Sequence, residues 1–244
     1  MKIQKYYNFI IVLVLIIIVV ALYLTYNKQK ILLQLSNSLI LFQDKRRTFD
    51  YKDYKELVQL QKNASTIKNE FLNNYPNLEL TNPGICDKKF KSDSNYGYYF
   101  LKFYGLIDKN EKHFPKTFNL VKSMPNLHTA FISVIKTSKK IPFHVGPYKG
   151  LLRFHLPLIN DYPDQSYLQV ENKKLYWNPH NPFLFDDTFK HKVDKFDKGL
   201  RVVLICDVER NLPQPLCWLN KKVLYLMEHS EYINSCRAKK NKKN

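Results

Sequence analysis

The stretch "FHVGPYKGLLRFHLPL" at residues 143–158 places two histidines and an arginine in an otherwise apolar run. His144 and His155 stand eleven positions apart, and Arg153 lies between them. Burying such side chains costs free energy unless each one is paired or bound to something. The stretch therefore predicts either a strand with satisfied polar side chains or one wall of a binding site.

Further β-rich runs surround this stretch, and turn residues separate them. The predicted strands cover residues 96–105, 129–135, 151–159, 166–177, 182–187 and 200–208. Apolar residues at helical spacing predict an amphipathic helix from Tyr54, and a second helix is expected around 216–232. Many short strands at near-regular spacing favour a mainly β fold, a double-stranded β-helix of the jelly-roll or cupin type with flanking helices.

The composition limits the classes of partner. The chain has 244 residues, 45% of them hydrophobic, and a formal net charge of +18. Such a charge fits an anionic lipid or an acidic substrate, or simply lysine as the default surface residue. The lysines are scattered without interleaved aromatic residues, which disfavours nucleic acid as a partner. Four cysteines without a CxxC pair indicate neither a disulfide framework nor a zinc site.

The N-terminal part predicts a single-pass membrane anchor. Residues 9–24 carry no charge, and tyrosines mark both ends of this run, as in an interfacial belt. No small-residue cleavage site follows, so a retained anchor is favoured over a signal peptide. Basic residues flank it on both sides and leave its orientation open. The predicted parts are a flank (1–8), the anchor (9–26), a juxtamembrane linker (27–53), the main domain (54–232) and a basic tail (233–244).

Four polar side chains in or beside the predicted strands are candidates for a site. His191 follows a double aspartate and lies 47 positions after His144, and in a jelly roll two such histidines can converge on one ion. Neutral imidazole is a good ligand for Fe(II). Arg153 and Arg201 need an anion, which a dicarboxylate would supply. Each histidine taken alone also fits a satisfied core or rim residue.

Several pieces in order resemble one known family. The segment "SVIKTSKKIPFHVGPYKGLLRFHLPL" (133–158), then Trp177, "FLFDDTFKHKV" (183–193) and "GLRVVLICDVERNLP" (199–213), resembles the aspartyl/asparaginyl β-hydroxylases. The resemblance covers about residues 98–213. It implies a dioxygenase that uses Fe(II), 2-oxoglutarate and O2 on a double-stranded β-helix.

The resemblance also implies a metal site. His144 and His191 match the two iron-binding histidines, and Asp187 matches an acidic residue that supports the water shell of the metal. Ordinary sites of this chemistry add a carboxylate two positions after the first histidine. Here that position is Gly146. The resemblance accounts for the missing acid, since family members bind iron with two histidines.

Four further positions match residues that hold the co-substrate. Arg153 and His155 match residues that contact 2-oxoglutarate, Arg201 matches the arginine that pairs with its distal carboxylate, and Ser133 matches a serine that touches it. His180 stands where the family usually has a glycine turn, and its Asn and Pro neighbours predict a loop.

The expected activity is hydroxylation of an unactivated C–H bond by a membrane-anchored enzyme. The β-carbon of Asp or Asn in a protein is the favoured substrate. The alternatives are an acyl chain of a lipid, hydroxylated by the same chemistry, or a catalytically inactive cupin-like binding module.

Overall fold

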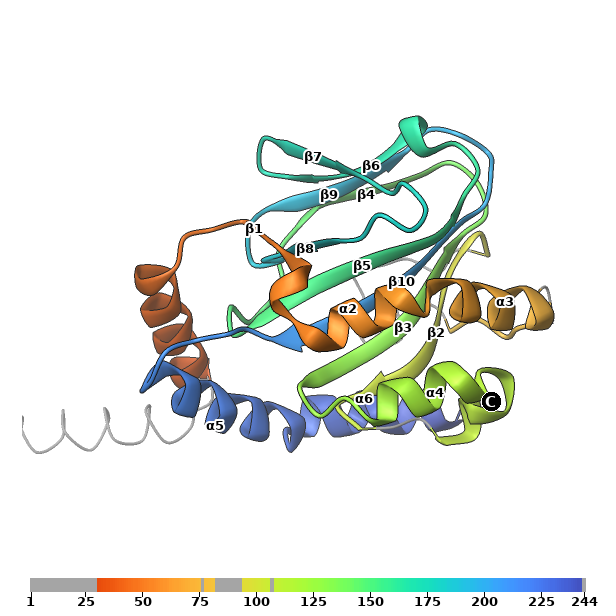
Figure 1. Cartoon of the computed structure of the whole chain (residues 1–244). Coiled ribbons are helices and arrows are strands. Elements are labelled where there is room, and N and C mark those ends of the chain that lie inside the picture. The colour runs from red at the N-terminus through yellow and green to blue at the C-terminus, as the bar shows by residue number, and fades with distance from the viewer. Residues whose placement is uncertain (1–29, 76, 82–93, 106–107, 243–244) are drawn as a thin grey trace, which may run out of the picture.

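The computed structural model describes residues 30–75, 77–81, 94–105 and 108–242 (Figure 1). Its helices are a first helix over residues 30–43, α2 (Lys55–Lys62), α3 (Ala64–Asn74), α4 (Pro115–Lys122), α5 (Leu216–Glu228) and α6 (Glu231–Lys242). Its strands are β1 (Thr48–Phe49), β2 (Tyr96–Phe103), β3 (Leu127–Ile135), β4 (Lys139–His144), β5 (Leu151–Asn160), β6 (Ser166–Val170), β7 (Lys173–Tyr176), β8 (Phe183–Phe185), β9 (His191–Lys195) and β10 (Arg201–Glu209).

The strands form two antiparallel sheets, as a mainly β, jelly-roll-like fold requires. The larger sheet has the order β1-β8-β5-β10-β3-β2, and the smaller one has the order β4-β9-β6-β7. Figure 1 shows the smaller sheet above β5 and β10. Apolar side chains from both sheets share one buried cluster, which includes Ile141, Val193 and Val203. The two sheets therefore enclose an interior.

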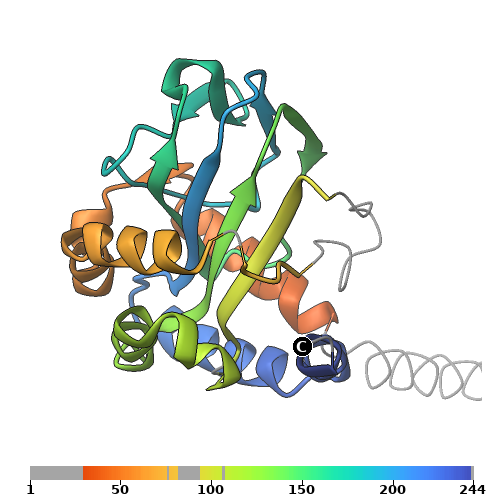
Figure 2. The same ribbon diagram turned by 90° about the vertical axis from the view of Figure 1, so that its right-hand side faces the viewer.

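Strand alternation sorts the residues of the larger sheet between its two faces, because successive side chains point to opposite sides. The even-numbered residues of β10, such as Leu204 and Cys206, pack in a cluster with helical residues such as Leu60 and Phe71. In Figure 2, α3 and α4 lie to the left of the strands, on this outer face. The odd-numbered residues of β10, from Arg201 to Asp207, are left to face the interior between the sheets.

The segment predicted as a juxtamembrane linker, residues 27–53, is largely structured from residue 30 onward. Its first part is the helix over 30–43, and its end forms β1, which pairs with β8 at the edge of the larger sheet. Tertiary contacts hold this edge strand, since the backbone N–H of Asp186 donates to the carbonyl of Arg47 at 2.9 Å. A two-residue strand carries no alternation pattern, which explains why the sequence alone did not predict it.

Other predicted elements need smaller corrections. The strand expected over 166–177 is a hairpin of β6 and β7, turned at Glu171, whose φ of 48° lies in the left-handed region. The tail predicted at 233–244 continues as α6 as far as Lys242. β4 and β9 were not predicted, because charged residues interrupt their alternation. The predicted membrane anchor lies outside the described residues, and none of the described helices is long and apolar enough to cross a bilayer.

Candidate active site

A cavity of ≈ 580 Å³ lies between the sheets, and all seven predicted site residues line it. They are Ser133, His144, Arg153, His155, Asp187, His191 and Arg201. Ser133, Arg153, His155 and Arg201 come from the inner face of β3, β5 and β10. The remaining three come from the smaller sheet and from the loop between β8 and β9.

The two candidate iron ligands face each other across one strand pair. β4 and β9 are antiparallel, and His144 is the register partner of His191, with ring centroids 4.1 Å apart. In each ring Nδ1 lies 2.9 Å from a backbone carbonyl, that of Pro142 for His144 and that of Phe189 for His191. A carbonyl only accepts, so Nδ1 carries the proton and Nε2 keeps its lone pair. This is the tautomer that a metal ion needs.

The His191 ring stays uncharged at neutral pH. Burial and the neighbouring His144 lower its pKa to about 3. Among the described residues, no three histidine, cysteine, aspartate or glutamate side chains lie together as a possible metal site.

The carboxylate of Asp187 occupies the space beside the first histidine. A Cβ built on Gly146 would overlap this carboxylate, and the backbone N–H of Gly146 donates to the carbonyl of Asp187 at 2.7 Å. Burial raises the pKa of Asp187 to about 6, although the Arg153 guanidinium, 2.9 Å away, opposes the rise. An acid therefore lies close to the position that ordinary two-histidine, one-carboxylate sites use, but it comes from another part of the chain.

We expect Gly146→Ala to destabilise the protein by about 1–3 kcal/mol, the usual cost of inserting a methyl group into packed atoms. Asp187 cannot yield easily, since its salt bridge to Arg153 holds it. Urea denaturation measures the effect. Val145→Ala is the control, because Val145 is 60% exposed and its truncation should cost less than about 0.5 kcal/mol. Equal unfolding midpoints for Gly146→Ala and the wild type would contradict the proposed close packing.

Arg153 lies in the cavity wall and is held by two carboxylates. Its Nε and Nη2 donate to Asp207 at 2.8 and 3.1 Å, and its Nη1 pairs with Asp187 at 2.9 Å. Thr129 donates to the same Asp207 carboxylate at 2.6 Å. Arg153 thus has acidic partners before any co-substrate binds, and its predicted contact with 2-oxoglutarate stays a prediction.

His155 presents an N–H group. Its Nδ1 accepts a hydrogen bond from the indole Nε1 of Trp177 at 3.0 Å, so the proton of the neutral ring lies on Nε2. Burial and the nearby guanidinium groups of Arg201 and Arg153 hold the pKa of His155 well below its usual value. No role was predicted for Trp177, although it ends the predicted strand over 166–177.

Arg201 is the most unusual side chain in the cavity. It is only 2% exposed, and the Cζ of its guanidinium lies 4.3 Å from the ring centroid of Trp177. Its Nη2 donates to the Ser133 hydroxyl at 3.0 Å, but Nε and Nη1 have no hydrogen-bond partner among the described residues. Burial lowers the pKa of Arg201 to about 10. Unused donors on a buried cation fit a carboxylate ligand.

Two tyrosines were not predicted as site residues. Tyr96 and Tyr98 lie on the inner face of β2, line the cavity, and their phenol groups are hydrogen-bonded to each other. Burial raises the pKa of both, so both stay protonated. Their i, i+2 spacing on a predicted strand was the only sequence signal.

The remaining lining of the cavity is largely apolar. Helix 30–43, α5 and α6 bring side chains from both ends of the chain to this wall. The apolar ones are Leu32, Leu33, Val223, Leu226, Met227 and Ile233, and Lys30 and Tyr232 join them. The cavity thus combines a cluster of imidazole and guanidinium groups with a hydrophobic surface.

Comparison with known proteins finds a matching family. The family model described as aspartyl/asparaginyl beta-hydroxylase matches residues 61–211. The chain is 32% identical over 148 residues to an ornithine lipid ester-linked acyl 2-hydroxylase of Rhizobium tropici. That match covers 60% of the chain and 53% of the relative, so it spans about half of the relative's length.

Solved structures with a similar arrangement include cupin domains. One is a cupin domain of a transcriptional regulator from Enterobacter cloacae, with 5% identity and a TM-score of 0.34, covering 48% of this chain and 100% of that one. Another is a cupin domain from Schizosaccharomyces pombe, with 9% identity and a TM-score of 0.34, covering 53% and 72%.

Proposed function

The chain belongs to the aspartyl/asparaginyl β-hydroxylase family, and from this we propose that it is an Fe(II)- and 2-oxoglutarate-dependent dioxygenase acting on the acyl chain of a lipid. The family makes it a hydroxylase. The metal, the co-substrate and the lipid are the proposed part. The buried Arg201 with its two unused nitrogen donors is the observation that carries the proposal.

His144 and His191 would hold the iron. Their tautomers leave both Nε2 atoms as lone-pair donors, and the carbonyls of Pro142 and Phe189 fix the ring orientations. When bound, Fe(II) with 2-oxoglutarate supplies the activation of O2 that C–H hydroxylation requires. Asp187, whose carboxylate lies against Gly146, would stand beside the bound metal and would accept a hydrogen bond from a water there.

The co-substrate would be held by the groups opposite. Arg201 offers Nε and Nη1 to the distal carboxylate, and Ser133, already bonded to Nη2, orients the guanidinium. His155 contributes its Nε2–H as a further donor. Trp177 supports both, because it donates to His155 and stacks on Arg201. These side chains bind and orient; none of them needs to transfer a proton.

The lining of the cavity favours a lipid over a protein substrate. The sequence alone favoured the β-carbon of Asp or Asn, a polar residue whose peptide backbone needs hydrogen-bond partners. The cavity wall formed by helix 30–43, α5 and α6 is mostly apolar instead. An acyl chain fits such a wall, and the relative from Rhizobium tropici is an acyl 2-hydroxylase.

The test uses the full chain with Fe(II), 2-oxoglutarate and ¹⁸O₂. It is offered an ornithine lipid in mixed micelles or a peptide that contains Asp and Asn. We expect one ¹⁸O in the acyl fragment by tandem mass spectrometry, with succinate formed in equal amount, and neither with His144→Ala. A labelled peptide and an unlabelled lipid would show that the substrate is a protein. A folded chain that turns over no 2-oxoglutarate would favour the binding module.

A bulky residue in the apolar wall should reduce lipid turnover selectively. We expect Met227→Trp to lower kcat/KM for the lipid at least tenfold, about 1.4 kcal/mol, because the larger ring fills part of the cavity. The Kd for 2-oxoglutarate should not change. Leu72→Trp on α3 is the control, since Leu72 is 46% exposed and lies outside the cavity lining. Equal losses in both variants would argue against an acyl chain at this wall.

A further inference from the structure

Exposed hydrophobic side chains are concentrated on three helices. Of the fourteen large hydrophobic residues that are exposed within the described part of the chain, eight belong to helix 30–43, α5 and α6. They are Leu35, Leu39, Leu41, Phe42, Trp218, Tyr225, Leu226 and Tyr232. We call this surface the helical face. Scattered exposed hydrophobic residues need no explanation, but a concentration of this kind marks an interaction site.

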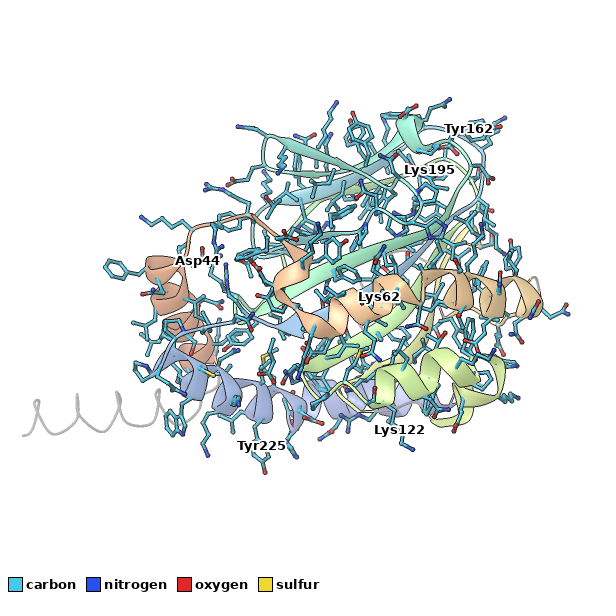
Figure 3. All side chains as sticks on the ribbon, viewed as in Figure 1. Asp44, Lys62, Lys122, Tyr162, Lys195 and Tyr225 are labelled. Carbon is cyan, nitrogen blue, oxygen red and sulfur yellow. The ribbon has the colours of Figure 1, made fainter. Side chains whose placement is uncertain are left out.

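The exposed residues form stripes that point away from the body of the protein. Leu35, Leu39 and Phe42 follow a spacing of four and three, which places them on one side of their helix, while Ile40 is buried on another. Trp218 and Tyr225 are seven residues apart on α5 and share its outer side. Figure 3 shows Tyr225 projecting from the lower side of this helix.

The charge of the same helices favours an anionic partner. Residues 216–242 contain six lysines and arginines against two glutamates, and Lys221 and Lys222 are exposed on α5. Helix 30–43 begins with the exposed Lys30 and carries no acidic residue. Apolar stripes bordered by basic residues are typical of surfaces that lie in the interface of anionic membranes.

The cavity opens at this face. Leu226 and Tyr232 are 39% and 58% exposed, and both line the cavity. Lys30, the first described residue, also lines it. The apolar run predicted as an anchor ends at Tyr26, and the four residues from there to Lys30 can span at most ~14 Å. A chain anchored by that run keeps the cavity opening close to the bilayer surface.

We propose that the helical face rests on the surface of an anionic bilayer, so that an acyl chain passes from the membrane into the cavity past Leu226 and Tyr232. The passage rests on the proposed lipid substrate, whereas the contact with the bilayer does not. The tyrosine and tryptophan rings lie at the level of the head groups, and the leucine and phenylalanine side chains of helix 30–43 lie against the acyl chains.

The two tryptophans of the chain provide the test. Trp218 is 59% exposed on the helical face, whereas Trp177 is fully buried against His155 and Arg201. The full chain is reconstituted into phosphatidylcholine–phosphatidylglycerol vesicles, with or without bromine on the acyl chains. We expect brominated lipid to quench at least half of the Trp218 emission. Trp218→Phe should remove the quenchable part, and Tyr162→Trp in that background should add an unquenched signal.

Unquenched Trp218 emission in anchored protein would overturn the proposal. If Trp218 were also shielded from acrylamide in water, a second copy or residues 1–29 would cover the face instead. A second variant separates the two proposals. Leu39→Glu with Phe42→Glu should lower turnover of lipid in vesicles at least tenfold and leave 2-oxoglutarate binding unchanged. A quenched Trp218 in a protein without hydroxylase activity would keep the membrane contact and reject only the proposed function.

Discussion

The His191→Ala variant is expected to lose Fe(II) binding and hydroxylation while keeping its fold. His144 and His191 are register partners and the two proposed protein ligands, so replacing one leaves a single proposed ligand at the metal position. Loss of a residue that only orients a ligand already costs about 10- to 100-fold in affinity or activity. Loss of the ligand itself should therefore exceed about 100-fold in both.

An anaerobic titration measures this loss. Fe(II) and 2-oxoglutarate are mixed with the protein, and the visible charge-transfer band of the chelate is recorded. Circular dichroism checks the fold. His180→Asn is the matched control, because His180 is exposed in a turn at a φ of 64°, a conformation that asparagine tolerates. The control should show the full band. A normal band from His191→Ala would show that His191 is not a ligand of the metal.

The Arg201→Met variant is expected to be more stable than the wild type and unable to bind 2-oxoglutarate. In the protein without ligand, a buried cation with two unsatisfied N–H groups costs free energy. Methionine fills a similar volume without that cost, so the free energy of unfolding should rise by about 1–3 kcal/mol. The same change removes the partner of the distal carboxylate, which should cost about 2–5 kcal/mol of binding free energy.

Opposite changes in stability and binding distinguish this prediction from simple damage to the fold. Urea denaturation gives the stability, and calorimetry gives the Kd for 2-oxoglutarate in the presence of a redox-inert divalent metal. Arg210→Met is the matched control. Arg210 is 3% exposed and also has two nitrogens without a hydrogen-bond partner among the described residues, but its Nη1 lies 2.9 Å from the buried Asp186 carboxylate. That variant should lose stability. Destabilisation of both variants alike would mean that Arg201 is a structural residue.

The inner-facing residues could be predicted from the sequence to a useful degree. Arg153 and His155 share one parity on a predicted strand, and Arg201 begins another, so alternation alone directs them to one face of a sheet. The order of the motifs and the resemblance to the family then led to His144, His191 and Asp187. All of these line one cavity.

Other features depended on contacts between distant segments. The pairing of β4 with β9 places His144 opposite His191, yet neither strand was predicted. The carboxylate of Asp187 fits only because Gly146, 41 positions away, has no side chain. Asp207 reaches Arg153 through the register of β5 with β10. No local sequence pattern predicts these pairings.

The preference for a lipid substrate likewise depends on contacts between distant segments. The sequence by itself determined the alternation of the strands, which follows from residue types two positions apart, and its motifs in order led to the candidate ligands. Only the tertiary structure brought helix 30–43 against α5 and α6 to form the apolar wall. Alternation is a property of neighbouring residues, whereas a wall built from both ends of the chain exists only after folding has closed the distance between them.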